Sequence, residues 1–170
     1  SIVSKTDLSG NIYYINESFL KISGFTEAEL IGQPHNIVRH PDMPPAAYED
    51  LWKTVKSGAT WTGTVKNRCK NGDFYWVTAN VTPLVENGQI TGYMSVRSMP
   101  SSKQVRDAEM IYKKVNSGKA SLAKLLSVKQ NSRFSYWLFG TVDTARVLMG
   151  GMLILAILPL LIHFAFVTTI

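Results

Sequence analysis

The sequence predicts an α+β fold for residues 1–100, in which short helices pack on one face of a five-stranded antiparallel sheet. The first observation is a series of three β-rich runs, at residues 61–68, 73–84 and 89–98. The second is that Asn-Gly pairs separate these runs, at Asn71-Gly72 and Asn87-Gly88. Because Asn-Gly between two strands is the strongest short hairpin signal, the three runs are expected to form a meander. Two strands before residue 16, with helices in between, complete one antiparallel sheet.

The first two strands are predicted at the start of the chain. A short β-prone run at residues 2–5 is followed by turn-forming residues at 7–11 and by an apolar and aromatic run at 12–15. Two such runs around a cluster of turn formers are typical of a hairpin. We therefore expect an antiparallel pair of strands ahead of the first helix.

Three helices are predicted between this hairpin and the meander. Asn16 precedes a helical pattern that stops at Ser23-Gly24, and a cap on this helix is favoured over ligand contact as its role. Thr26 and Glu29 have the spacing of a capping box, which predicts a short second helix. Residues 46–58 carry apolar side chains at helical spacing and end on glycine, which predicts an amphipathic third helix.

Charge and hydropathy divide the chain into three parts. Residues 1–100 hold nine Lys or Arg and nine Asp or Glu, whereas residues 101–146 hold nine and three and therefore carry the whole net charge of +6. Residues 147–170 contain no Asp, Glu, Lys or Arg and are long enough to cross a bilayer, which needs about 20 apolar residues. The expected domains are a globular domain at 1–100, a basic helical linker at 101–146 and a transmembrane helix at 147–170.

These charges also predict where the protein lies in the cell. Basic flanks of a membrane span usually face the cytoplasm. The single cysteine, Cys69, excludes an internal disulfide and suits a reducing compartment. We therefore expect an inner-membrane protein with its N-terminal domain in the cytoplasm. Nucleic acid is not an expected partner, because this domain is neutral and the basic residues adjoin the predicted span.

The most informative stretch for function is residues 32–44, Gly-Gln-Pro-His-Asn-Ile-Val-Arg-His-Pro-Asp-Met-Pro. Its prolines fix the backbone and remove amide donors, so it is expected to be a stiff connection with single helical turns. Rigid loops with convergent polar side chains commonly hold a polar ligand. An enzyme is not expected, because the sequence has no nucleophile elbow, no Cys or His cluster at metal spacing and no glycine-rich phosphate loop.

Two phrases of the sequence resemble the PAS sensor family: Ile-Ser-Gly-Phe-Thr-Glu-Ala-Glu-Leu-Ile-Gly at 22–32 and Lys-Asn-Gly-Asp-Phe-Tyr-Trp-Val at 70–77. The loop at 32–44, with Trp-Thr-Gly-Thr-Val-Lys-Asn-Arg at 61–68, is similar to the aerotaxis receptor branch of that family. The resemblance implies a PAS fold, a non-covalently held FAD and a membrane-anchored homodimer that senses redox or energy state. It also implies output to a chemotaxis coupling protein and a histidine kinase through a downstream region.

A bound flavin would give each polar residue an expected role. Asn67 can donate and accept at once, which suits the edge of the flavin ring, and flavin-binding relatives carry Asn at the aligned position. The Arg39 guanidinium can form a bidentate hydrogen bond to a phosphate. Asp42 is expected to orient Arg39 or a ribose hydroxyl, with a salt bridge to Arg39 that only pins the loop as the alternative. Three more side chains are expected to bond to phosphate or to the adenine end: His35, Asn36 and His40.

Other interpretations stay open. Trp52 and Trp61 either wall the flavin ring or fill the core, with core packing favoured for Trp52. A haem would use His35 or His40 as its axial ligand, and the chain would then be an oxygen sensor. A cofactor-free PAS interaction module of a membrane receptor or kinase is the third interpretation. Light-driven adduct chemistry is disfavoured, because photosensory relatives carry its cysteine in the helical loop and Cys69 lies on a strand.

Overall fold

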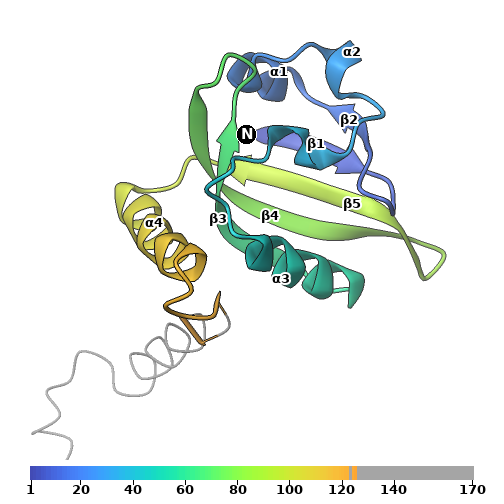
Figure 1. Ribbon diagram of the computed structural model, residues 1–170. Coiled ribbons are helices and arrows are strands. Elements are labelled where there is room, and N and C mark those ends of the chain that lie inside the picture. The colour runs from blue at the N-terminus through green and yellow to red at the C-terminus, as the bar shows by residue number, and fades with distance from the viewer. Residues whose placement is uncertain (123, 126–170) are drawn as a thin grey trace, which may run out of the picture. The chain divides into compact units, whose positions relative to one another are not determined.

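The computed structural model describes residues 1–122 and 124–125. This part of the chain contains one five-stranded sheet with the strand order β2-β1-β5-β4-β3, and every neighbouring pair is antiparallel (Figure 1). The strands are β1 (Ile2–Thr6), β2 (Ile12–Ile15), β3 (Trp61–Arg68), β4 (Phe74–Glu86) and β5 (Gln89–Ser98). The predicted sheet is thereby confirmed, and β3 and β5 have the predicted bounds.

The turn between β4 and β5 shows why the Asn-Gly signal worked. Asn87 has φ of 51° and Gly88 has φ of 79°. A two-residue hairpin turn of the type that matches strand twist needs positive φ at both central residues, and Asn and Gly tolerate this best. Gln89 accordingly pairs with Glu86, directly across the turn.

The helices between β2 and β3 follow their predicted signals. They are α1 (Glu17–Ser23), α2 (Glu27–Leu30), the 3₁₀ turn η1 (His35–Val38) and α3 (Pro45–Lys56). Asn16 caps α1, since its Oδ1 accepts from the amide of Phe19 at 3.2 Å, and the same oxygen accepts from the amide of Val3 at 3.0 Å. Thr26 and Glu29 form the predicted capping box of α2. Both capping predictions are confirmed.

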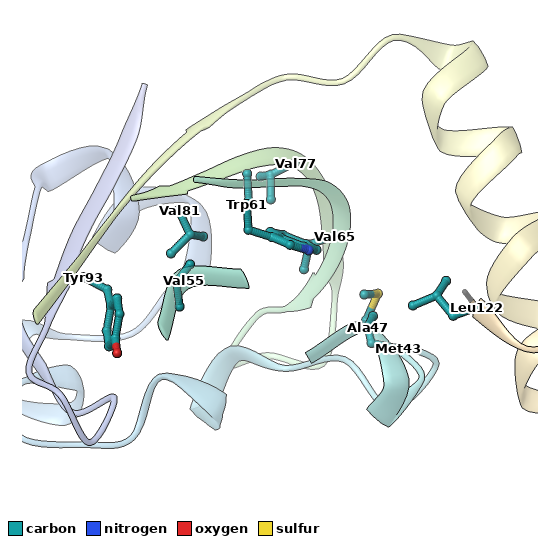
Figure 2. Packing of buried hydrophobic residues seen from close by; sticks show 10 residues of the cluster. Met43, Ala47, Val55, Trp61, Val65, Val77, Val81, Tyr93 and Leu122 are labelled. Atoms are coloured by element: carbon teal, nitrogen blue, oxygen red, sulfur yellow. The ribbon is translucent and has the colours of Figure 1, made fainter. Parts of the chain in front are cut away.

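Two buried apolar clusters hold the helices to the sheet. The smaller one joins α1, α2 and η1 to β2 through Ile12, Ile15, Phe19, Leu30 and Val38. The larger one lies between α3 and the inner face of the sheet, where Figure 2 shows Val55 of α3 beside Val81 and Tyr93 of the strands. Burial of each of these side chains stabilises the fold by about 1.5–3 kcal/mol.

A further helix, α4 (Ser102–Asn116), follows the sheet. Its N-terminus carries a capping box of Ser101 and Gln104, and its residues belong to the same compact unit as the sheet, which runs from Ser1 to Leu122. The predicted linker therefore begins with a helix that packs on the domain. No helix in the described part of the chain is long and apolar enough to span a membrane. The predicted transmembrane helix at 147–170 lies outside the described residues, as do residue 123 and residues 126–146 of the linker.

Candidate functional site

A cavity of about 480 Å³ lies against the inner face of the sheet. Its walls come from β1 and the turn after it, from η1 and its flanks, from α3 and from β3, β4 and β5. A volume of this size is typical of small-molecule sites, which measure about 300–1,000 Å³. The lining combines aromatic side chains with a few polar ones, which is the usual composition of a cofactor pocket.

The polar part of the lining is a cluster of Ser4, His35 and Arg97. The Arg97 guanidinium donates through Nη2 to His35 Nε2 at 2.6 Å and to Ser4 Oγ at 3.0 Å. Burial, with the Arg97 charge second, lowers the pKa of His35 to about 3. The imidazole is therefore neutral at pH 7, and because Nε2 accepts from Arg97, the ring proton lies on Nδ1.

Arg97 carries a buried charge that this part of the protein leaves unbalanced. Its exposed fraction is 4%, and burial lowers its pKa to about 10, so it remains a cation at pH 7. In residues 1–122 no ion pair joins it to a carboxylate, and its Nη1 has no hydrogen-bond partner. The Oγ of Ser95, which also lines the cavity, is likewise without a partner. Buried polar groups are nearly always hydrogen-bonded in folded proteins. These two groups therefore have capacity for a ligand.

Aromatic rings form another wall. Trp61 is 7% exposed, and its Nε1 donates to Asp50 Oδ2 of α3 at 2.8 Å. Its ring covers Gly63, where a Cβ would collide with the indole. Trp52 of α3 meets Tyr93 of β5 edge to face, with 5.3 Å between ring centroids. Both tryptophans line the cavity and also pack in or against the larger cluster.

The segment after η1 is tied to β3 at the cavity. An isolated antiparallel bridge joins the backbones of Arg39 and Asn67, and both residues line the cavity. The Arg39 guanidinium lies 3.9 Å from the centre of the Tyr48 ring on α3. Three cations, Arg39, Lys56 and Arg97, line this cavity, whereas its lining in the described part of the chain includes no Asp or Glu. The chemistry of the lining therefore favours an anionic ligand.

His40 and Asp42 lie outside the lining, at the free edge of the sheet beside β3. Asp42 Oδ2 pairs with Lys66 Nζ at 2.7 Å, and the ammonium group lies 4.1 Å above the Phe74 ring. His40 Nδ1 accepts from the Asp42 amide at 3.1 Å, and its ring meets Phe74 edge to face. These contacts hold the loop against the outer part of the strand.

Comparison with known proteins identifies the family. A family model described as the PAS fold matches residues 12–97. The chain belongs to the PAS family. The chain is 50% identical over 121 residues to the aerotaxis receptor of Escherichia coli (strain K12), a match that covers 71% of this chain and 24% of that protein. Over 96 residues the chain is 27% identical to the nitrogen fixation regulatory protein of Klebsiella pneumoniae, with 56% and 19% covered. This chain thus spans about a quarter or less of the length of these relatives.

Solved structures share the fold of the PAS domain. The dark structure of the blue-light photoreceptor Aureochrome1 LOV gives a TM-score of 0.57 at 20% identity and covers 64% of this chain and 85% of that one. A light-oxygen-voltage domain studied with a flavin analogue gives 0.54 at 21% identity, with 70% and 87% covered. At these identities the likeness concerns the fold.

The PAS domain brings six of the eight predicted site residues to one cavity: His35, Asn36, Arg39, Trp52, Trp61 and Asn67. His40 and Asp42 are not among them. The predicted contact between Asp42 and Arg39 is wrong, because Asp42 pairs with Lys66 and Arg39 lies over Tyr48. Asp42 turns away because the strand edge offers a nearly buried lysine, whose side chain is only 11% exposed.

Sequence reasoning missed the most distinctive residues of the PAS domain cavity, Arg97 and its partner Ser4. The available signal was strand alternation, which places Tyr93, Ser95 and Arg97 on one face of β5. An arginine in the same phase as a buried tyrosine indicates a polar interior. Met94 and Val96 alternate on the opposite face of β5, and the local sequence does not show which of the two faces is buried.

We expect the stability of the PAS domain to depend on His35 between pH 6.5 and about 3. The ordinary pKa of histidine, 6.5, applies in the unfolded chain, and the folded value is about 3. Between these values the unfolded chain binds more protons, so this contribution is complete above pH 6.5 and is lost as the pH falls towards 3. Urea unfolding at pH 7 and pH 5 measures the free energy of unfolding that is lost between these two pH values. His35→Gln is expected to reduce this loss. An unchanged loss in the variant would show that His35 is not its source.

Proposed function

We propose that this PAS domain binds FAD in the cavity and senses redox or energy state from the cytoplasm. The observation that carries the proposal is Arg97, a buried cation that has no carboxylate partner in residues 1–122 and that lines a cavity with aromatic walls. A flavin has a flat apolar ring with acceptors and donors on one edge and an anionic tail, and when bound it supplies reversible electron uptake. The lining offers a matching group to each of these parts.

The residues that would hold the flavin fall into three sets. Arg97, Ser95 and Asn67 are the candidates for the polar ring edge, because the first two have unpartnered polar atoms and the amide of Asn67 can donate and accept. Trp52 and Trp61 would wall the ring. The candidates for the anionic tail and the other polar groups of the cofactor are Arg39, His35 and Asn36. We propose that His40 and Asp42 act indirectly, by holding the loop through Lys66.

The similarity to the aerotaxis receptor supports the wider part of the proposal. We infer a membrane-anchored homodimer in the inner membrane that signals to a chemotaxis coupling protein and a histidine kinase through a region beyond this chain. The excess of Lys and Arg in residues 101–146 supports a cytoplasmic sensor domain. The light-oxygen-voltage domain studied with a flavin analogue supports a flavin as the ligand of this fold.

The contacts of the two histidines count against the haem alternative. An axial ligand needs a free nitrogen lone pair that faces the cofactor. His35 uses Nε2 to accept from Arg97, and a cation beside the ligand nitrogen would weaken its donation to iron. His40 lies outside the cavity lining, and its Nδ1 accepts from the Asp42 amide. A flavin therefore fits this site better than a haem.

An absorption spectrum of the purified full chain tests the proposal. Two visible bands of a flavin are expected, and FAD should be recovered as the nucleotide after heat release. A Soret band would show that the cofactor is haem and not a flavin. A colourless protein that does not take up added FAD would overturn the proposal and leave the cofactor-free interaction module as the best account.

Replacing Asn67 with alanine should weaken FAD retention. A buried polar group that loses its partner costs about 1–3 kcal/mol, which corresponds to a loss of affinity by about one to two powers of ten. Titration of the flavin-free protein with FAD measures this change. Asn71→Ala, in the exposed β3–β4 turn, is the control and should leave affinity unchanged. Equal affinities for wild type and Asn67→Ala would remove Asn67 from the site.

A further inference from the structure

The contacts of α4 with the PAS domain fix which side of this helix faces outwards. Its inner side packs against the larger cluster through Ile111, Tyr112 and Val115. Tyr112 Oη also donates to the carbonyl of Thr64 on β3 at 2.7 Å, and Figure 1 shows the helix beside this strand. The rotation of α4 about its axis is therefore set by the fold, and so is the composition of its outer side.

The outer side of α4 is basic near its C-terminal end. Lys113 and Lys114 are exposed, and Met110, one helical turn earlier, has an exposed fraction of 56%. Residues three and four apart are neighbours on the surface of a helix, so Met110 lies next to both lysines. Neither lysine takes part in an ion pair within the part of the chain that the structure describes.

The turn after α4 adds a third lysine to this side. Gly118 has φ of 70°, its amide donates to the carbonyl of Val115 at 3.0 Å, and the amide of Lys119 donates to the carbonyl of Lys114 at 3.0 Å. This is the pattern of a Schellman motif, which holds the backbone of Lys119 against the last turn of the helix. Lys119 is exposed and has no ion pair in residues 1–122. The basic surface consists of Met110, Lys113, Lys114 and Lys119.

Stabilisation of α4 by its own lysines does not account for the whole pattern. Cations near a helix C-terminus interact favourably with the helix dipole, but this effect falls off within the last turn. The positive charge extends much further, because residues 110–142 contain six Lys or Arg and no Asp or Glu. The uncharged apolar run at 147–170 follows this stretch. Clusters of four to eight Lys or Arg beside a membrane span are typical of binding to anionic lipid headgroups.

We propose that the basic surface docks the PAS domain on the anionic headgroups of the cytoplasmic leaflet. The proposal rests on the membrane anchor and the cytoplasmic location inferred above, and it does not depend on FAD. An anionic leaflet attracts each nearby Lys or Arg strongly enough to change a binding equilibrium about fivefold, so three lysines together favour the docked state about a hundredfold. An anchor in the same chain keeps the headgroups at high effective concentration, so weak contacts are sufficient.

Energy transfer between the domain and the bilayer tests this docking. The full chain is placed in nanodiscs of phosphatidylcholine, alone or mixed with phosphatidylglycerol. A donor dye on Ser117→Cys, in a Cys69→Ser background, then reports the distance to acceptor dyes on the headgroups. Transfer should be stronger with phosphatidylglycerol. It should fall when salt is raised from about 0.1 M to about 1 M, which shortens the Debye length from about 10 Å to about 3 Å.

The results separate this proposal from the membrane anchor. Equal transfer in the two kinds of nanodisc would overturn docking on lipid, leave the anchor intact and assign the basic surface to an acidic protein partner. A chain that does not stay in the nanodisc would overturn the anchor and the docking together.

Replacing lysines of the basic surface is the second test. Lys113→Gln with Lys114→Gln should lower the ratio of docked to undocked domain about twenty-fivefold, at about fivefold per lysine. Lys113→Arg with Lys114→Arg keeps the charge and should keep the docking. Lys21→Gln with Lys53→Gln makes the same change in net charge at exposed positions of α1 and α3 and is the matched control. Unchanged docking in the first pair, or an equal loss in the control pair, would contradict the proposal.

Discussion

Arg97→Met is expected to abolish FAD retention while leaving the flavin-free PAS domain at least as stable as before. A hydrogen bond to a charged group contributes about 1.5–3 kcal/mol, so FAD affinity should fall by about ten- to a hundredfold or more. The flavin-free fold should not suffer, because the variant removes a buried cation that has no carboxylate partner in residues 1–122. Replacing buried charges with apolar groups of similar volume is often neutral or stabilising.

The contacts around Arg97 explain why the variant should weaken FAD binding without destabilising the flavin-free fold. Without the guanidinium, Ser4 Oγ and His35 Nε2 remain 3.1 Å apart and can bond to each other. Titration with FAD and urea unfolding without FAD measure the two effects separately. Arg106→Met, on the exposed face of α4, is the matched control and should change neither quantity. A flavin-free fold that loses several kcal/mol would show that Arg97 is a structural residue.

Gly63→Ala is expected to displace the Trp61 ring and thereby to disrupt the wall of the cavity. A Cβ at this position would overlap the indole ring, which is held in place by its bond to Asp50. The ring must tilt into the cavity and give up that bond. Forcing extra volume into a packed site costs about 1–3 kcal/mol, so the variant should be less stable by that amount and should bind FAD at least about tenfold more weakly.

Unfolding and FAD titration of Gly63→Ala measure both losses. Thr64→Ala changes the neighbouring residue on β3, whose side chain faces away from the cavity, and serves as the control. Adding Trp61→Phe to Gly63→Ala supplies a smaller ring and should recover part of the lost stability. Full FAD affinity in Gly63→Ala would show that the indole does not need its present position to form the cavity wall.

Most of the fold could be predicted because its signals are local. The Asn-Gly turns, the Asn16 cap and the capping box of Thr26 and Glu29 each depend on residues within a few positions of one another. Backbone preferences and short hydrogen bonds decide such features before any tertiary contact forms. The five strands and their antiparallel pairing therefore followed from the sequence, as did the position of the polar loop at 32–44.

The candidate site was only partly predictable. Loop residues such as His35 and Arg39 stood out because prolines and polar side chains are concentrated there. The sequence could not show that Asp42 would pair with Lys66, because these residues lie on different elements. Sequence spacing shows which side chains belong to one loop. It does not show which of them turn towards the cavity and which towards the strand edge.

Arg97 shows what only the tertiary structure decided. Alternation along β5 determined that Tyr93, Ser95 and Arg97 share one face and that Met94 and Val96 share the other. It did not determine which of these two faces is the inner one. The pairing of Ser4 with Ser95, together with the position of His35 above β1, surrounds the guanidinium with partners up to 93 residues away in sequence. The sequence by itself thus determined the elements and the residues that share a face, whereas burial of a cation in the cavity depended on long-range packing, because only the assembled sheet and loop supply its hydrogen bonds.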